Sequence, residues 1–325
     1  MKTKYYQEID ALYTIGIVLV IFGHSHPSDW SLFAGSGFEK AILFVYAFHM
    51  PLFFFAAGFL LRNSASLPLL SKAEWLKGKA LKLLLPYAVL SLAGLLPKYL
   101  AENGSLAGLS LQKALFFLLV PRQNVWGHFW FMPVLFAMDL LFVLLPKTSA
   151  SVYLLAGICG GLYFLPLRPL TFAADISTNL VFFAAGMAVK ELGLIEWLRE
   201  HRGFCRCFAP AGMAAGWLLF RYLHAGRAAM LVCAFAMIGA CLCVSVLLGP
   251  SALTKAVSRF SMTFYLYGWM FQAVTMFVCG RLHLHWPFVS VLMFAAGVLG
   301  PAGLILFCRK AGLRHPLLDL LTGMK

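Results

Sequence analysis

The chain has 325 residues, of which 62% are hydrophobic and only 12% are charged. A soluble domain is roughly half apolar and a quarter charged, so this composition excludes a soluble protein and indicates an integral membrane protein. The formal net charge is +14. The Lys and Arg residues stand in short clusters between apolar stretches and do not follow one face. This distribution argues against a nucleic-acid partner and predicts membrane lipids around the chain.

Ten apolar stretches approach the length of about 20 helical residues that crosses a hydrocarbon core. In chain order they are 10–26, 40–61, 79–97, 126–145, 150–165, 171–189, 205–221, 228–248, 257–279 and 286–308. No connection between them is long enough to fold alone, since an autonomous core takes roughly 50 residues or more. We therefore expect an all-α integral membrane protein, a bundle of about ten transmembrane helices that forms one domain over residues 1–325.

The distribution of basic residues predicts the orientation of this bundle. With the N-terminus inside, eighteen Lys and Arg fall on the cytoplasmic side and eight on the other, and cytoplasmic loops normally carry the excess. Both termini are therefore expected in the cytoplasm. Glu8 and Asp10 interrupt the flank of the first apolar stretch, and no small-residue cleavage site follows it. We interpret this stretch as a retained helix and not as a signal peptide.

The eight cysteines form no pattern typical of a disulfide framework or a metal site. Five lie within apolar stretches, and three lie near the predicted cytoplasmic face, where disulfides are rare. Neither Cys-x-Cys pair has a second pair at zinc-finger spacing. We expect the cysteines to pack in the core and expect no metal.

Two histidines stand at positions where a membrane tolerates an ionisable group least. His24 closes the first apolar stretch near its outer end, and Asp10 begins the same stretch about 21 Å away along a helix. An imidazole at this depth usually faces a cavity or the bundle interior, and a neutral one can take a proton from a hydroxyl. The alternative is that His24 marks the membrane boundary and forms hydrogen bonds with Ser25, Ser28 or headgroups.

His49 is expected near the middle of the second stretch. Pro51 follows it and removes a backbone donor, which usually kinks a membrane helix and makes room for polar groups. His49 is therefore predicted either to line a cavity or to be a packed, hydrogen-bonded core histidine.

Four lysines form the densest basic cluster on the predicted cytoplasmic side: Lys72, Lys77, Lys79 and Lys82. Lys79 and Lys82 are three residues apart, so they are neighbours on one helix face and can bind the phosphates of an anionic ligand. The same residues also fit a positive-inside anchor.

The outer connection between the third and fourth stretches is apolar from Ala107 to Val120 but too short to be a confident span. We expect either a helix on the outer surface or a re-entrant piece that lines a cavity. It leads to Trp126, His128 and Trp130. These side chains fit an interfacial aromatic belt, or a site where aromatic faces stack on the sugar ring of an acceptor.

Several motifs, taken in order, resemble the membrane-bound acyltransferase family 3. They are Asp10 with Gly23-His24, the run from Phe48-His49-Met50-Pro51 to Leu60, Lys79-x-x-Lys82 before Pro86-Tyr87, and Phe129-Trp130-Phe131-Met132-Pro133. Within that family the chain is most similar to stand-alone sugar O-acetyltransferases of the fucose 4-O-acetylase-like kind. The match covers the first 140 residues in order, and the ten-helix count agrees with the rest.

The resemblance implies a bacterial cytoplasmic-membrane enzyme that takes an acetyl group from acetyl-CoA inside and delivers it to a hydroxyl of a glycan. The family's essential histidine falls on His24, which would act as general base or as a transient acyl carrier. The family's basic pair, implicated in handling CoA, falls on Lys79 and Lys82. His49 would line the acetyl route as a second catalytic residue. We assign substrate binding to Trp126, His128 and Trp130, and also to Asp10.

Three positions depart from the family pattern. Tyr13 replaces an arginine eleven residues before the histidine, the basic pair is lysine and not arginine, and Tyr265-Leu266-Tyr267-Gly268 lacks a late histidine. Two other functions stay open: a transporter or flippase with a histidine-lined path, for which Asp139 and Asp175 are the candidate coupling carboxylates, and a non-enzymatic envelope scaffold.

Overall fold

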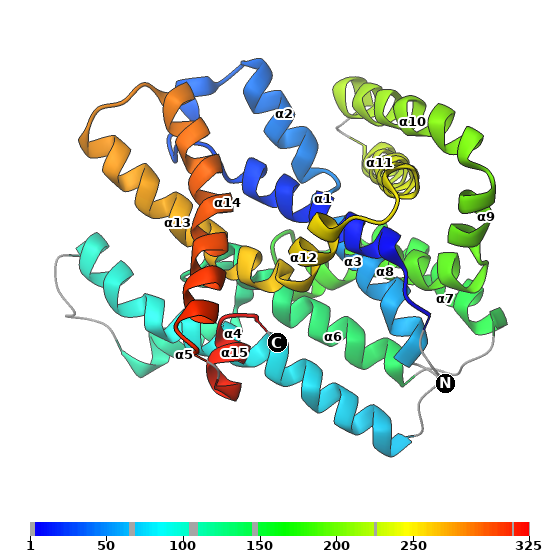
Figure 1. The fold of residues 1–325 in the computed structure, drawn as a ribbon, viewed down its shortest axis with the longest axis horizontal. Coiled ribbons are helices and arrows are strands. Elements are labelled where there is room, and N and C mark those ends of the chain that lie inside the picture. Colours follow the sequence, from blue (N-terminus) through cyan, green and yellow to red (C-terminus); the bar gives the residue numbers. More distant parts are fainter. Residues whose placement is uncertain are drawn as a thin grey trace. The chain divides into compact units, whose positions relative to one another are not determined.

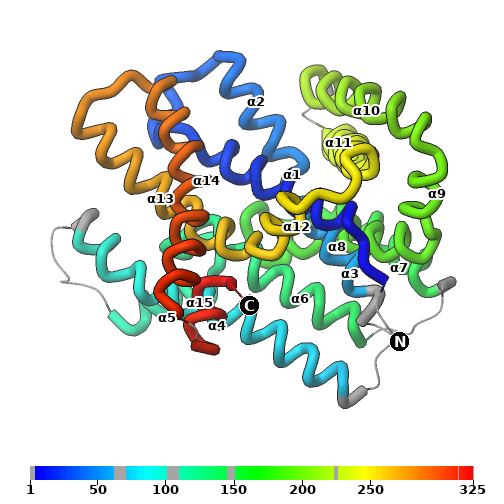
Figure 2. Tube along the Cα trace, viewed as in Figure 1, coloured from blue at the N-terminus to red at the C-terminus, as the bar shows by residue number. Residues whose placement is uncertain are grey.

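The computed structural model describes residues 4–64, 69–103, 110–144, 149–223, 226–313 and 315–324 (coloured in Figure 2). All regular structure within these ranges is helical, as expected. The contacts divide the chain into two compact units. The described residues of unit 1 come from 4–56, 192–313 and 324, and those of unit 2 come from 57–191 and 315–323.

Unit 1 is organised around the first helix of the chain. Its elements are α1 (Gln7–Gly23), the 3-10 turn η1 (Trp30–Phe33), α2 (Gly37–Tyr46), the first part of α3 (His49–Ser64), α9 (Leu194–Glu200), α10 (Arg202–Leu223), α11 (Arg227–Leu248), α12 (Ala252–Arg259), α13 (Ser261–Arg281) and α14 (Trp286–Lys310). The helix α1 contacts α2, α11, α12, α13 and α14. In Figure 1 it lies between the paired helices α10 and α11 and the paired helices α13 and α14. Both ends of α1 are therefore held by helices from the C-terminal half of the chain.

Unit 2 is built on two packed helix groups. Its elements are the rest of α3, α4 (Leu69–Asn103), α5 (Leu111–Leu119), η2 (Pro121–Gln123), η3 (Gly127–Trp130), α6 (Phe131–Val143), α7 (Ser149–Tyr163), α8 (Phe172–Glu191) and α15 (Pro316–Leu321). The long α4 packs against α5, α6 and α15, and α8 packs against α6 and α7. A Cβ at Gly58 of α3 would overlap the backbone carbonyl of Phe183 in α8, so glycine permits this close helix approach.

Seven described helical segments are long and apolar enough to cross a membrane. They are Gly37–Leu61, Ser71–Leu100, Phe172–Glu191, Arg202–Tyr222, Arg227–Leu248, Ser261–Arg281 and Trp286–Lys310. The other three predicted stretches coincide with shorter helices, namely α1, Gly127–Val143 and Ser151–Tyr163. The chain is thus an all-helical protein with several helices able to span a membrane.

The predicted helix at 40–61 is divided into α2 and α3, which are separated by Ala47 and Phe48. The cause is Pro51, because its ring would clash with the carbonyl of residue 47 in a continuous helix, whereas the first turn of a new helix accepts proline. The amide of Leu52 donates to the carbonyl of Phe48, which starts the ladder of the new helix. His49 therefore stands at the beginning of a helix and not in its middle.

Two other predictions concern segments that the structure describes only in part. Of the outer connection 107–120, residues 107–109 lie outside the described ranges, and α5 forms the rest, with Leu111 and Leu119 each 77% exposed. Four residues of the charge count, namely Lys2, Lys147, Arg314 and Lys325, also lie outside the described residues.

Candidate functional site

The predicted catalytic residue His24 is the C-cap of α1, and its amide donates to the carbonyl of Val20 over 3.1 Å. A helix end leaves backbone carbonyls without partners, and here a polar side chain from another helix takes one of them. The amide nitrogen of Gln272 in α13 donates to the carbonyl of Ile21 and to the Ser25 hydroxyl, both over 2.8 Å. Gln272 is 1% exposed. The half-buried His24 thus follows a helix turn that is fixed from within the core.

Tyr46, the last residue of α2, brings three histidines together. Its hydroxyl donates to the carbonyl of Gly23 over 2.6 Å, and its ring covers Gly23, where a Cβ would come within 2.8 Å of the ring. The ring centroid lies 5.9 Å from that of His24 and 5.4 Å from that of His49. The Nε2 atom of His26 lies 3.3 Å from the same hydroxyl. Gly23 therefore precedes His24 because only glycine leaves room for this tyrosine.

His49 is a buried histidine with a defined hydrogen bond. Its Nδ1 atom donates to the carbonyl of Val45 over 2.8 Å, and the side chain is 6% exposed. A carbonyl can only accept, so Nδ1 carries the hydrogen and, in the neutral ring, Nε2 carries the lone pair. The side chain can therefore accept a hydrogen bond or a proton at Nε2.

His26 lies in an aromatic cluster next to His24. Its ring is 4.5 Å from that of Trp30 and 5.6 Å from that of Phe33, and Trp286 of α14 lies 5.8 Å from Phe33. The Nδ1 atom of His26 donates to the carbonyl of Pro27 over 2.7 Å, so the ring is held between the aromatic cluster and the backbone.

Asp10 lies at the opposite end of α1 from His24, as the helix length requires. Its carboxylate accepts hydrogen bonds from the hydroxyl of Tyr5 and, over 2.6 Å, from that of Ser258 next to the end of α12. The bond to Asp10, aided by burial, raises the pKa of Tyr5 to about 12. In this arrangement Asp10 joins α1 to α12.

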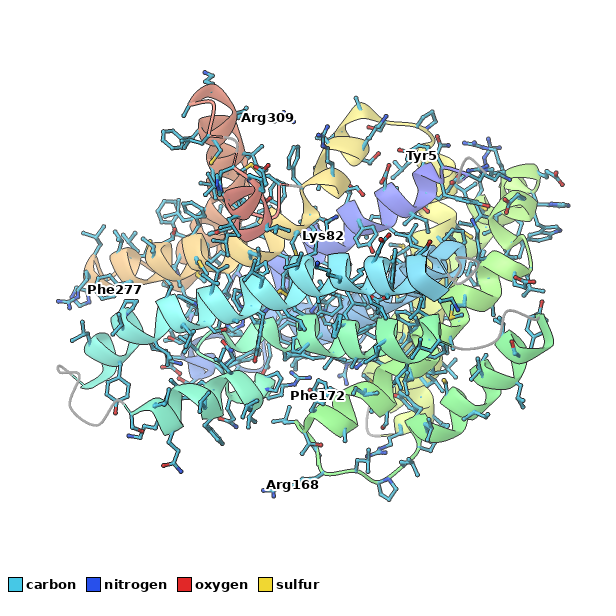
Figure 3. The ribbon with its side chains drawn as sticks, turned by 90° about the horizontal axis from the view of Figure 1, so that it is seen from below. Tyr5, Lys82, Arg168, Phe172, Phe277 and Arg309 are labelled. Carbon is cyan, nitrogen blue, oxygen red and sulfur yellow. The ribbon has the colours of Figure 1, made fainter. Side chains whose placement is uncertain are left out.

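The two candidate donor-binding lysines of α4 have different surroundings. The Nζ atom of Lys79 lies 2.9 Å from Oδ2 of Asp139 in α6, whose side chain is fully buried, and 4.9 Å from the ring centroid of Trp75. Lys82 is exposed on α4 and is labelled in Figure 3. Lys79 therefore neutralises an internal carboxylate, whereas Lys82 is an exposed residue of the same helix.

The first part of the predicted acceptor site is attached to α4. The indole Nε1 of Trp126 donates to the carbonyl of Leu90 over 2.8 Å, and its ring packs where Gly94 has no side chain. Trp126 remains partly exposed. The ring of His128 makes an edge contact with Phe129, with 4.6 Å between the ring centroids.

The second part is a stacked ion pair. Arg122 donates two hydrogen bonds, of 2.8 and 2.6 Å, to the carboxylate of Asp175 in α8. Its guanidinium carbon lies 3.7 Å from the ring centroid of Trp130, which is only 8% exposed. Trp130 thus has one face covered by arginine, and Asp175 is neutralised by the same side chain.

The structure brings His24 and His49 together in unit 1 and adds His26, Tyr46 and Gln272, which the sequence did not single out. The candidate residues Lys79, Lys82, Trp126, His128 and Trp130 all belong to unit 2. The run His24-Ser25-His26 was a local signal for His26. Gln272 binds Ser25, the neighbour of His24, across 247 residues and leaves no local signal. Within the described part of the chain, no three His, Cys, Asp or Glu side chains gather as a metal site would require.

Comparison with known protein families gives a match. The profile of the acyltransferase family 3, described as an acyltransferase domain, covers residues 6–306, which include every candidate site residue. No curated protein and no solved structure matches the chain. Because the match extends over nearly the whole chain, the protein belongs to the membrane acyltransferase family 3.

Proposed function

We propose that this enzyme transfers an acetyl group from cytoplasmic acetyl-CoA to a hydroxyl of a cell-surface or lipid-linked glycan. Family membership gives acyl transfer in general, and the donor, the acceptor and a bacterial cytoplasmic membrane are our proposal. The observation that carries it is the gathering of His24, His26 and His49 around Tyr46, where the apolar helix α1 ends. Ionisable groups in such surroundings are costly and therefore usually functional.

In the proposed reaction, His24 acts as the general base. A ring nitrogen of the neutral imidazole takes the proton from the acceptor hydroxyl while the hydroxyl oxygen attacks the thioester carbonyl. The carbon–sulfur bond then breaks, the CoA thiolate leaves, and the proton on His24 returns to that sulfur. The products are the acetyl ester and CoA with a free thiol. His49, through Nε2, orients the thioester or lines its route.

The donor and acceptor sites follow from the charge and aromatic patterns. Lys82 is the exposed member of the basic pair and would contact the CoA phosphates, while Lys79 holds the local geometry through Asp139. The orientation that we propose has about ten spans and both termini inside, which puts this pair on the cytoplasmic side.

For the acceptor, the partly exposed Trp126 supports sugar stacking better than Trp130, because Arg122 already covers one face of Trp130. His128, beside Trp126 in the chain, would provide a polar contact to the sugar. Asp10 would act through its bonds to Tyr5 and Ser258, since protein groups already occupy its carboxylate.

The decisive experiment replaces His24. We expect His24→Ala, expressed and inserted normally, to lose at least about 100-fold in acetyl transfer, since general-base catalysis contributes on this scale. The measurement is the O-acetyl content of surface glycan by NMR, together with acetyl-CoA turnover in proteoliposomes. His201→Ala is the matched control because His201 stacks on Trp197 at the end of α9, away from this cluster. Unchanged acetylation in His24→Ala would refute the proposal.

The transporter alternative finds no support in the charges. Both candidate coupling carboxylates are paired, Asp139 with Lys79 and Asp175 with Arg122. A transporter would move its substrate in vesicles without consuming acetyl-CoA, so the proteoliposome assay separates the two functions.

A further inference from the structure

Two arginines from different helices of unit 1 share one aromatic ring. Arg309, labelled in Figure 3, lies in the last turn of α14. Its guanidinium carbon is 4.7 Å from the ring centroid of Phe260. Arg259, the last residue of α12, has its guanidinium carbon 5.6 Å from the same centroid. The two guanidinium carbons are therefore no farther apart than the sum of their distances to the shared ring centroid. Phe260 is 7% exposed, so its ring provides a fixed base under both side chains.

Neither of these guanidinium groups forms an ion pair with any residue that the structure describes. Arg122 and Arg199, in contrast, each bind a carboxylate with two hydrogen bonds. Two exposed like charges on one ring repel each other, and no carboxylate among the described residues pairs with either of them. An anion between them would remove the repulsion and use the planar donors of both arginines.

A third cation and a cavity extend this pair along α12. Lys255 precedes Arg259 by four residues, so both side chains lie on one face of the helix. The Nζ atom of Lys255 lies 5.6 Å from the ring centroid of Tyr5. Lys255 and Tyr5 line a cavity of about 260 Å³ together with Ser251 and Thr254. This volume is below the roughly 300–1,000 Å³ of a pocket for a whole small ligand, so the cavity fits one part of a larger molecule.

We propose that Lys255, Arg259 and Arg309 form a phosphate-binding site on unit 1, made of other residues than the lysine pair of α4. The matching ligand carries several phosphates and a flat ring, with the phosphates on the cations and the ring in the cavity beside Tyr5. CoA, which has a diphosphate, a phosphomonoester and an adenine, has this chemistry. This assignment of the ligand rests on the proposed function. A phospholipid headgroup is the other source of the same phosphate chemistry, and it needs no acyltransferase activity.

The test uses the full chain in nanodiscs of phosphatidylcholine alone, so that no anionic lipid competes. Binding of CoA is measured by calorimetry for the wild type and for Arg259→Gln/Arg309→Gln. The control is Arg206→Gln/Lys310→Gln, which removes the same charge from exposed residues without a shared ring. We expect the first variant to bind CoA about tenfold or more weakly, and the control to stay within about twofold of the wild type. If the double variant fails to fold, Arg309→Lys keeps the charge without the planar group, and we expect a smaller but measurable loss.

A second arm identifies the source of the phosphate. Phosphatidylglycerol is added to the nanodiscs, and its effect on the thermal unfolding midpoint is compared between the same variants. If CoA binding is unchanged but the stabilisation by phosphatidylglycerol is lost in Arg259→Gln/Arg309→Gln, the site holds and its ligand is a lipid. If neither quantity differs from the control, the site is refuted. Parallel acetyl-transfer assays on the wild type separate these results from a failure of the proposed function, since binding can persist in a chain without transfer.

Discussion

At the residue scale, the end of α1 is held by side chains that are far apart in the sequence. Tyr46 binds the carbonyl of Gly23, and Gln272 binds the carbonyl of Ile21 and the hydroxyl of Ser25. These bonds fix the backbone on both sides of His24. A catalytic base must be held close to its productive position, so these residues are expected to act on the rate more than on binding.

Tyr46→Phe tests this expectation, because it removes the hydroxyl but keeps the ring contacts with His24 and His49. We expect kcat to fall about tenfold with KM nearly unchanged, since a small displacement of His24 affects the transition state. Steady-state kinetics with acetyl-CoA and a soluble glycan acceptor measure both constants. The control is Tyr6→Phe, which removes a hydroxyl that donates to Glu196 over 2.8 Å at the other end of α1. Each variant should lose about 0.5–1.5 kcal/mol of stability, and equal activities in the two would contradict the positioning role.

The lysine pair provides a second test at this scale. Lys79→Ala leaves the fully buried carboxylate of Asp139 without its counter-ion, and we expect a loss of about 1–3 kcal/mol in the free energy of unfolding. Lys82→Ala removes an exposed charge, so it should weaken CoA binding with little effect on stability. Thermal unfolding and CoA calorimetry on both variants measure this difference. Similar unfolding midpoints for the two would show that the pair with Asp139 contributes no stability.

The part of the candidate site that the sequence predicts consists of residues whose type is unusual at their position along the chain. His24 and His49 are polar residues in apolar stretches, and Lys79 with Lys82 is a local spacing. Gln272 and the Lys79–Asp139 pair depend on contacts between separate helices, which a single sequence does not encode locally. Tyr46 was hidden because a tyrosine in an apolar stretch is an ordinary core residue until its hydroxyl is seen on Gly23.

At the element scale, apolar length predicted where helices lie, and local breaks changed how they end. Pro51 divides the stretch 40–61 into α2 and α3, and the short α12 is separated from α13 at Phe260. Pro51 was recognised in the sequence as a kink, but a proline does not reveal whether a helix bends or starts anew. Phe260 gives no such signal in the sequence. Its ring at this boundary contacts the guanidinium groups of Arg259 and Arg309, and Arg309 comes from a distant helix.

Gly58 tests the close approach of α3 and α8 within unit 2. A Cβ there would overlap the carbonyl of Phe183, which is backbone and cannot rotate away, so Gly58→Ala should cost about 1–3 kcal/mol of stability. Gly157→Ala in α7 is the control, because a Cβ at that position meets no atom within 4 Å. The control should be neutral or slightly stabilising, as alanine favours a helix interior. Thermal unfolding measures both, and a Gly58→Ala midpoint equal to that of the control would contradict the close approach.

At the scale of the whole molecule, unit 1 is formed by two segments that are far apart in the sequence. Between them lie the 135 residues 57–191, which belong to unit 2. At the start of α1, ion pairs connect the first of these segments to α9 of the second. Arg199 of α9 binds Glu8 with hydrogen bonds of 2.8 and 2.7 Å, and Glu8 is 1% exposed. Beside this pair, Glu196 accepts from Lys4 over 2.6 Å and from Tyr6 over 2.8 Å. The hydrophobic pattern predicts α1 and α11 as separate helices, but not that the chain returns to pack on its own first helix.

This connection gives unit 1 a pH dependence. Burial raises the pKa of Glu196, but the hydrogen bonds from Lys4 and Tyr6 outweigh it and lower the pKa from 4.5 to about 2. A carboxyl whose folded pKa lies below its unfolded value stabilises the fold above pH 4.5, and this contribution is lost as the pH falls from 4.5 toward 2. The side chain is about a third exposed, so we expect at most about 1 kcal/mol. The measurement compares unfolding midpoints of the wild type and Glu196→Gln. The wild type should be more stable at pH 7 and equal at pH near 2, and a gap that widens on acidification would contradict this assignment.

The bond between Glu8 and Arg199 also sets a condition on how the protein is made. Arg199 follows Glu8 by 191 residues, so at about 5–20 residues per second the ribosome adds it roughly 10–40 s later. Throughout that interval the first helix carries a carboxylate whose partner has not yet been translated, and residues 57–191 of unit 2 are synthesised in the meantime. The first helix to emerge must therefore wait for a later one before its charged end can be buried.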